Sequence, residues 1–187
     1  SQSYLRLKNV DYEEFREMMD IRTNSSNNTV YADSSGNIAY FHGNFMPRRN
    51  PSFDYGAPVD GSDPATDWQG LHTVDETVHL LNPATGWLQN CNSTPYTAAA
   101  EASPKRADYP AYMAPDPENH RGIHAVQVLE DAHNVTLDGL IELAYDPYLP
   151  GFEKLLSGLI EAVDAYAKAP AAWAGPIEAL RTWDLHT

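Results

Sequence analysis

Two asparagines that lie two positions apart, Asn90 and Asn92, are the residues of this sequence best suited to chemistry. An asparagine carboxamide is an uncharged N–H donor that does not titrate, so it can stabilise a negative oxygen that develops during a reaction. The alternative role for Asn92 is that of a turn residue, because a Ser-Thr-Pro tripeptide follows it. For Asn90 we favour a structural role that supports its neighbour.

The only cysteine of the chain, Cys91, lies between the two asparagines. A single cysteine excludes a disulfide within the chain. Its thiol is either a nucleophile or a small buried side chain. We favour the buried side chain, because no histidine or acidic residue stands in a recognisable pairing with it.

The first 45 residues predict a helix followed by a β-hairpin. A helix is expected within residues 1–22, with a capping-box-like start at Asp11–Glu14. Its apolar face consists of Phe15, Met18 and Met19. The polar run Asn24–Asn28 ends the helix. Residues 29–45 then alternate as two strands around a turn in which Gly36 can adopt a positive φ.

Residues 46–118 differ in kind, because they hold ten of the fourteen prolines. A segment of this length without regular structure is usually functional or disordered. Its two tryptophans and four tyrosines argue against disorder. We therefore expect an ordered wrap of turns and short strands laid over a larger body, with strands at Val78–Leu81 and Gly86–Gln89.

Four helices are predicted in residues 119–187 from their apolar periodicity. They are expected at Arg121–Asp131, after a cap at Thr136, at Gly151–Ala167 and at Pro176–Trp183. The third has an apolar stripe made of Leu155, Leu156, Leu159, Ile160 and Val163. The fold class is therefore α+β, in one unit of 187 residues with parts at 1–45, 46–118 and 119–187.

The charge balance excludes several classes of partner. The chain has 12 basic and 26 acidic side chains, a net charge of −14. Such a surface repels phosphate backbones and anionic lipids, and no apolar run is long enough to span a bilayer. We expect neither nucleic acid nor a membrane as a partner. The acidic run Asp60–Asp67 lacks the EF-hand pattern, and the seven histidines show no paired ligand spacing, so we assign no metal ligand.

Several short motifs occur in one order along the chain. They are Tyr31-Ala-Asp33, Phe41-His-Gly-Asn44, Pro47-Arg-Arg49, Asp67-Trp-Gln-Gly70, Asn82-Pro-Ala-Thr-Gly-Trp87, Asn90-Cys-Asn92, and Arg121 at the start of a helix. This ordered set resembles the penicillin acylase (penicillin amidase) family across residues 10–185. The Asn-Cys-Asn form is more similar to the acyl-homoserine-lactone and aculeacin acylases than to the penicillin G acylases.

The resemblance implies an N-terminal-nucleophile hydrolase with a four-layer αββα core. In that family a precursor is cut into α and β chains, and the new N-terminal serine of the β chain attacks an amide carbonyl with its own amine as the base. The family's oxyanion asparagine maps to Asn92, and its active-site arginine maps to Arg121. A nearby cation keeps the amine neutral. The alternative for Arg121 is a solvated residue of the first helical turn.

The resemblance also implies that the sequence is an internal part of the β chain. The family's Ser-Asn start is missing, and Ser1, which Gln2 follows, is expected to be a chain end rather than a nucleophile. The expected partners are the α chain, the rest of the β chain and a small N-acyl substrate. We assign no cofactor to this segment. Family Ca²⁺ ligands lie mostly outside it, and one is a proline where this chain has Tyr55. Family members are commonly periplasmic or secreted.

Two other functions fit the same residues. The chain could be a non-catalytic binding or structural module on this scaffold, which would be indicated if the upstream coding sequence lacked the Ser-Asn start. It could also bind carbohydrate or peptide through the aromatic side chains of residues 46–118, which would require them to form an exposed strip.

Overall fold

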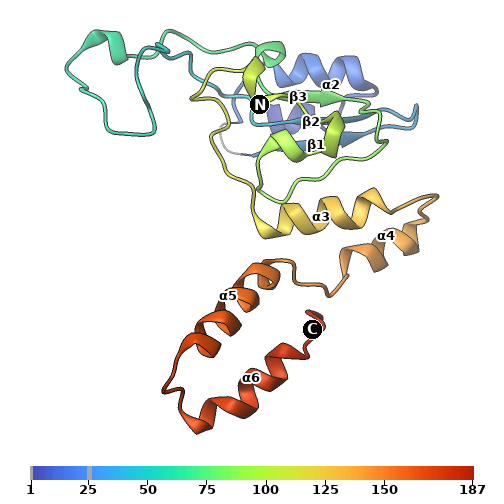
Figure 1. The fold of residues 1–187 in the computed structure, drawn as a ribbon. Helices are drawn as coiled ribbons and strands as arrows, with labels where there is room; N and C mark the ends of the chain where they lie inside the picture. The colour runs from blue at the N-terminus through green and yellow to red at the C-terminus, as the bar shows by residue number, and fades with distance from the viewer. Residues whose placement is uncertain (1, 25–26) are drawn as a thin grey trace. The chain divides into compact units, whose positions relative to one another are not determined.

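The computed structural model describes residues 2–24 and 27–187, and the chain divides into two compact units. The first is Ser1–Gly122 and the second is Ile123–Thr187. Ser1 and two serines of the expected break at Asn24–Asn28 lie outside the described residues. Both helices and a small antiparallel sheet are present, so the predicted α+β class is confirmed (Figure 1).

The first unit is built on three antiparallel strands in the order β1-β2-β3. They are β1 (Thr29–Ala32), β2 (Ile38–Phe41) and β3 (His79–Leu81). The predicted hairpin is therefore confirmed as β1 and β2. Its turn is tied together by Asp33, whose carboxylate accepts hydrogen bonds from the backbone N–H groups of Ser35 and Asn37 at 2.9 and 3.0 Å. Gly36 has φ +87°, a value that glycine adopts without a steric cost.

The helical start differs from the expected single helix. Residues 2–22 form two helices, α1 (Gln2–Leu5) and α2 (Tyr12–Met19), separated by a turn. The capping interaction is present, because the backbone N–H of Glu14 donates to Asp11 Oδ1 at 2.9 Å. Asp11 has an extended backbone, which stops any helix that approaches from the N-terminal side.

Helix α2 packs on one face of the sheet. Phe15, Met18 and Met19 are buried, as predicted, against Ala39 and Phe41 of strand β2. Side chains alternate across a strand, so the residue between these two β2 positions faces away from α2. That residue is Tyr40, which is 1% exposed. The sheet is thus buried on both faces at its central strand.

The proline-rich segment is ordered chiefly by 3₁₀ turns. These are η1 (Pro64–Thr66), η2 (Val74–Glu76), η3 (Pro95–Thr97), η4 (Ala100–Ala102) and η5 (Arg106–Asp108). The strand predicted at Val78–Leu81 is present as β3. The one predicted at Gly86–Gln89 is wrong. Gly86 has φ +76°, and the N–H of Gln89 donates at 2.8 Å to Ala98, which ends a 3₁₀ turn rather than a partner strand.

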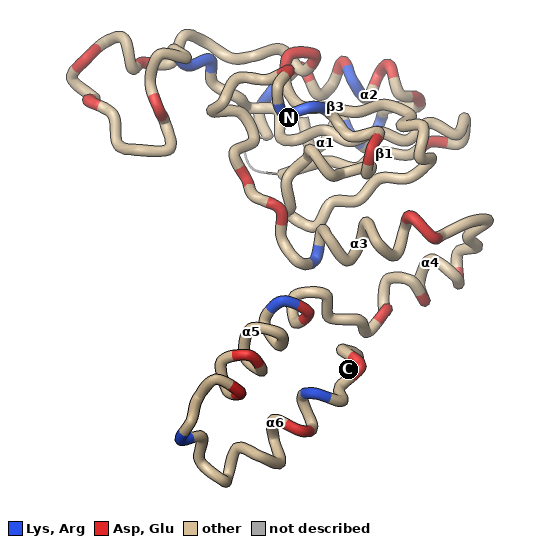
Figure 2. The backbone as a smooth tube through the Cα atoms, in the orientation of Figure 1, with Lys and Arg blue, Asp and Glu red and all other residues tan. Residues whose placement is uncertain are grey.

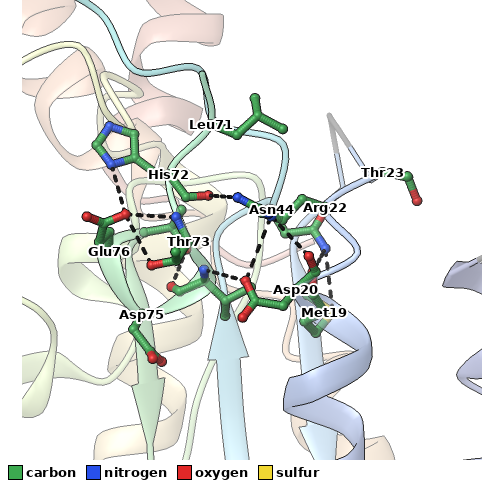
Figure 3. Close-up of polar contacts among 12 residues, drawn as sticks. Met19, Asp20, Arg22, Thr23, Asn44, Leu71, His72, Thr73, Asp75 and Glu76 are labelled. Atoms are coloured by element: carbon green, nitrogen blue, oxygen red, sulfur yellow. Dashed lines mark hydrogen bonds and ion pairs between the residues drawn. The ribbon is translucent and has the colours of Figure 1, made fainter. Parts of the chain in front are cut away.

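A polar network fixes two loops against α2: the loop after β2, which contains Asn44, and the loop that contains Val74 (Figure 3). Asn44 is 1% exposed. Its Nδ2 donates to the carbonyl of Met19 at 2.7 Å, and its Oδ1 accepts from the N–H of Asn24 at 3.0 Å. Asp20 accepts from the N–H of Val74 at 3.1 Å. Because the loop after β2 is anchored at Asn44, its neighbour Gly43 has a fixed position.

The second unit is helical, as predicted. Helix α3 (His120–Glu130) begins in the first unit, and α4 (Leu137–Ala144), α5 (Gly151–Ala165) and α6 (Ala174–Arg181) follow. The predicted cap of α4 is present, since Thr136 Oγ1 accepts from the N–H of Gly139 at 3.1 Å. Phe152 and Trp183 pack edge to face with their ring centroids 5.2 Å apart.

The second unit has little interior of its own. Within Ile123–Thr187, all of which the structure describes, no residue is buried. The apolar stripe of α5 is only partly covered, with Leu155 64% exposed and Leu159 44% exposed. A helix that presents apolar residues along one face is normally covered by another element.

Acidic side chains occur along the whole described chain, whereas basic ones are sparse (Figure 2). The Asp60–Asp67 run forms turns, as expected: Asp60 Oδ1 accepts from the N–H of Ser62 at 2.9 Å, and Asp63 Oδ1 accepts from the N–H of Ala65 at 2.9 Å. No helix of the described chain is both long and apolar enough to cross a membrane.

Candidate functional site

Asn92 borders a cavity of about 240 Å³ in the first unit. The lining combines a residue directly before β1 with residues from the loop after β2 and from the proline-rich segment. They are Asn28, His42, Gly43, Phe45, Met46, Asn92, Ser93 and Asp116. The lining therefore includes both polar side chains, among them the predicted oxyanion donor, and the apolar side chains of Phe45 and Met46.

The backbone of Asn92 is in the left-handed region, with φ +51°. Asparagine adopts this conformation more readily than most residues, but it still costs energy. Asn90 supports it: Asn90 Oδ1 accepts from the N–H of Asn92 at 3.4 Å and from Nδ2 of Asn28 at 3.1 Å. Asn90 thus makes structural contacts, in agreement with the role we favoured for it.

Within residues 2–24 and 27–187, the side chains of the two predicted site residues, Asn92 and Arg121, are not engaged in hydrogen bonds or ion pairs. The carboxamide of Asn92 makes no hydrogen bond there, and Asn92 is exposed at the cavity edge. Arg121, in the first turn of α3, is also exposed and makes no ion pair within the same residues. Both groups are therefore available to a ligand.

A third residue, Asn119, links the loop of Asn92 to the start of the helix that carries Arg121. Its Nδ2 donates to the carbonyls of Cys91 and Asn92 at 3.1 and 2.9 Å. Its Oδ1 accepts from the N–H of Gly122 at 2.9 Å, which caps α3. The sequence holds a weak signal for this role, because asparagine is a favoured cap and Asn119 lies two residues before the predicted helix start at Arg121. Its bonds to the Asn92 loop have no such signal.

His42 also lines the cavity. Its Nδ1 lies 2.9 Å from the hydroxyl of Tyr40, and its Nε2 lies 3.6 Å from Asp116 Oδ2. Burial lowers the pKa of His42, and the carboxylate of Asp116 opposes that shift. The predicted role of the histidines as structurally bonded side chains fits this one.

The remaining candidates have no reactive partners among the described residues. Cys91 is partly exposed rather than buried, because its loop lies at the surface, and no acidic or histidine side chain bonds to its thiol in the described chain. No group of three His, Cys, Asp or Glu side chains converges in residues 2–24 and 27–187. Asp54, next to Tyr55, instead accepts from the N–H of Gly56 at 2.8 Å. We therefore assign no step to a Ca²⁺ ion.

Comparison with known proteins places these features in a family. The penicillin amidase family model matches residues 2–187. Penicillin G acylase of Escherichia coli is 34% identical over 84 residues, which are 45% of this chain and 9% of that protein. A thermostable penicillin G acylase from Alcaligenes faecalis has a similar structure, with a TM-score of 0.62 at 19% identity. The match covers 99% of this chain and 32% of that one.

The likeness of structure to that solved acylase supports the predicted α+β fold class. The chain spans about a third of the solved relative and matches less than a tenth of the E. coli protein. Because the family model extends over the described helices and sheet alike, the chain as a whole belongs to the penicillin amidase family.

Proposed function

We propose that this chain is a segment of an N-acyl amide hydrolase, in which Asn92 donates an N–H to the oxyanion of the tetrahedral intermediate. The observation that carries the proposal is the free carboxamide of Asn92 at the edge of the cavity. A neutral donor placed in advance stabilises charge that appears only in the transition state. The family membership of the chain supports amide hydrolysis as the reaction.

The cavity has properties that suit an acyl substrate. Phe45 and Met46 offer apolar surface for the acyl chain in the same cavity that Asn92 lines. The N–H of Asn92 already bonds to Asn90 Oδ1, so the free donor is the side chain and not the backbone. His42 lines the same cavity, and burial lowers its pKa, which favours the uncharged imidazole.

The nucleophile and the rest of the substrate site belong, in this proposal, to polypeptide outside these 187 residues. The small share of each relative that the chain matches supports this division. The second unit also supports this division. No residue of Ile123–Thr187 is buried, and Leu137 is 77% exposed. The partners are then the α chain and the remaining β chain, in a periplasmic or secreted enzyme. No metal or cofactor is assigned to this segment.

The direct test is an activity assay on the complete protein that contains this segment. We expect it to release free amine from N-acyl amides that differ in the length of the acyl chain, measured by mass spectrometry of both products. Heat-denatured protein is the control for spontaneous hydrolysis. No product from any amide, together with no serine start in the upstream coding sequence, would favour the non-catalytic module instead.

A second prediction concerns Arg121, which we place near the amine of the nucleophile. A cation there lowers the pKa of the amine, because the protonated form is repelled. In the complete protein, Arg121→Met should therefore shift the acidic limb of the kcat/KM profile to higher pH, by about 1 unit. Arg121→Lys keeps the charge, so its acidic limb should stay close to the wild-type position. An unchanged acidic limb in Arg121→Met would contradict this role.

A further inference from the structure

We propose that Asn119 is a positioning residue for Asn92, and that its carboxamide sets the backbone angles of the oxyanion donor. This inference rests on the proposed function of Asn92. Asn119 does not border the cavity. It therefore acts on the reaction only through the residues that it holds.

The argument begins with the two carbonyls that Asn119 binds. The carbonyl of Cys91 belongs to the peptide unit before the Cα of Asn92, and the carbonyl of Asn92 belongs to the unit after it. A peptide unit is planar, so the φ and ψ angles of Asn92 describe how these two planes rotate about its Cα. One NH₂ group bonds to both planes, at 3.1 and 2.9 Å. The two bonds together restrict both angles.

Those angles need such restraint. Asn92 is left-handed, with φ +51°, and a conformation of this kind persists only where its surroundings enforce it. The bond from the Asn92 N–H to Asn90 Oδ1 is long, at 3.4 Å. The bonds from Asn119 are shorter and act on both sides of the residue. Asn119 is thus the stronger of the two restraints on the conformation.

The same side chain joins this loop to the start of α3. Its Oδ1 accepts from the N–H of Gly122, and its own backbone N–H donates to Ser93 Oγ at 3.1 Å. Ser93 is 4% exposed. A Cβ at position 122 would lie only 2.4 Å from Ser93 Oγ, so the close approach depends on glycine. Glycine is unfavourable inside a helix, and its presence here fits a packed junction.

The test uses Asn119→Asp in the complete protein. Aspartate keeps the oxygen that caps Gly122, because it is as good a helix cap as asparagine. It replaces the donor with a carboxylate oxygen that repels both carbonyls. We expect kcat to fall tenfold to about a hundredfold with little change in KM, since a small misplacement of a catalytic group has effects of this size. A crystal structure should show Asn92 outside the left-handed region.

Two further variants separate positioning from stability. Asn119→Ser also caps the helix but is too short to reach the carbonyls, so it should reproduce the loss if the aspartate variant does not fold. Thr136→Val removes the corresponding cap of α4. It should lower the melting temperature and leave kcat unchanged. An equal loss of kcat in Thr136→Val would show that destabilisation alone explains the effect, and would overturn the inference.

A double variant distinguishes this inference from the proposed function. If Asn119 acts through Asn92, adding Asn119→Asp to Asn92→Gly should cause no further loss of kcat. Additive losses would overturn the positioning role while leaving Asn92 as the donor. If Asn119→Asp kept the wild-type kcat while Asn92→Gly lost most of it, the positioning role would also be overturned and Asn92 would remain the donor. Wild-type kcat in Asn92→Gly would refute the donor itself, and the inference with it.

Discussion

Replacing Asn92 with glycine in the complete enzyme is expected to lower kcat by about 10²–10³-fold, the usual cost of removing one oxyanion donor. The loss should appear in kcat and in kcat/KM to the same extent, because the interaction forms only in the transition state. Steady-state kinetics with a chromogenic N-acyl amide would measure both constants.

Glycine is the appropriate substitution because Asn92 has φ +51°. Glycine adopts a positive φ without strain, so Asn92→Gly removes the carboxamide and leaves the backbone geometry accessible. Asn92→Ala removes the same group but adds strain. The two variants should therefore lose similar activity, while only the alanine variant loses additional stability. A large difference in kcat between them would indicate that the backbone, and not the donor, matters.

Asn134 offers a matched control. It is also a left-handed asparagine, with φ +53°, and it lies in the second unit, outside the residues that line the cavity. Asn134→Gly should leave kcat within about twofold of the wild type, the scatter expected for a substitution away from the site. If Asn92→Gly behaved like Asn134→Gly, Asn92 would be a turn residue, which is the alternative that its sequence context allows.

The second large effect concerns the 187-residue polypeptide alone. We expect it to hydrolyse no N-acyl amide above the rate in buffer, because the proposed site lacks its nucleophile. Loss of the nucleophile costs a serine hydrolase of the order of 10⁶-fold in kcat. The polypeptide should also bind a hydrophobic dye, since its second unit leaves Leu137 and Leu155 exposed by 77% and 64%.

The control for this experiment is the Asn92→Gly form of the same polypeptide, purified identically. Any trace of activity that persists in that form comes from a contaminating hydrolase. Amide turnover by the unaltered polypeptide that disappears in Asn92→Gly would contradict the proposal, because it would place a complete site within these residues. Activity that returns on mixing with the remaining parts of the enzyme would support it.

Elements that depend on local signals were predictable from the sequence. The β1–β2 hairpin follows from its turn residues, and α4 begins where Thr136 caps it. The separate helix α1 was not predictable, because Gln2 is held through its Oε1 by the N–H of Thr23, 21 positions away, at 2.9 Å. A contact between residues so distant in sequence leaves no periodic trace in either segment.

The site divides in the same way. Asn92 is proposed from its type, its neighbours and the family resemblance, and its left-handed backbone agrees with the preferences of asparagine. Its link to Asn119 could not be identified, because the two residues lie 27 positions apart. Neither side of that bond has a pattern that points to the other. His42 and Asp116 meet at the cavity for the same non-local reason.

The bonds of Asn119 also close a loop that contains residues 93–118. The two ends of this loop, Asn92 and Asn119, are joined by a direct hydrogen bond that does not involve the residues between them. The entropic free-energy cost of closing a loop rises by only about 0.6 kcal/mol when the length of the loop doubles. Lys105, which is exposed and directly precedes η5, is therefore a position where residues can be inserted while Asn92 and Arg121 keep their places. Protein engineers who wish to reshape the wall around Asp116 could vary this loop in length as well as in sequence.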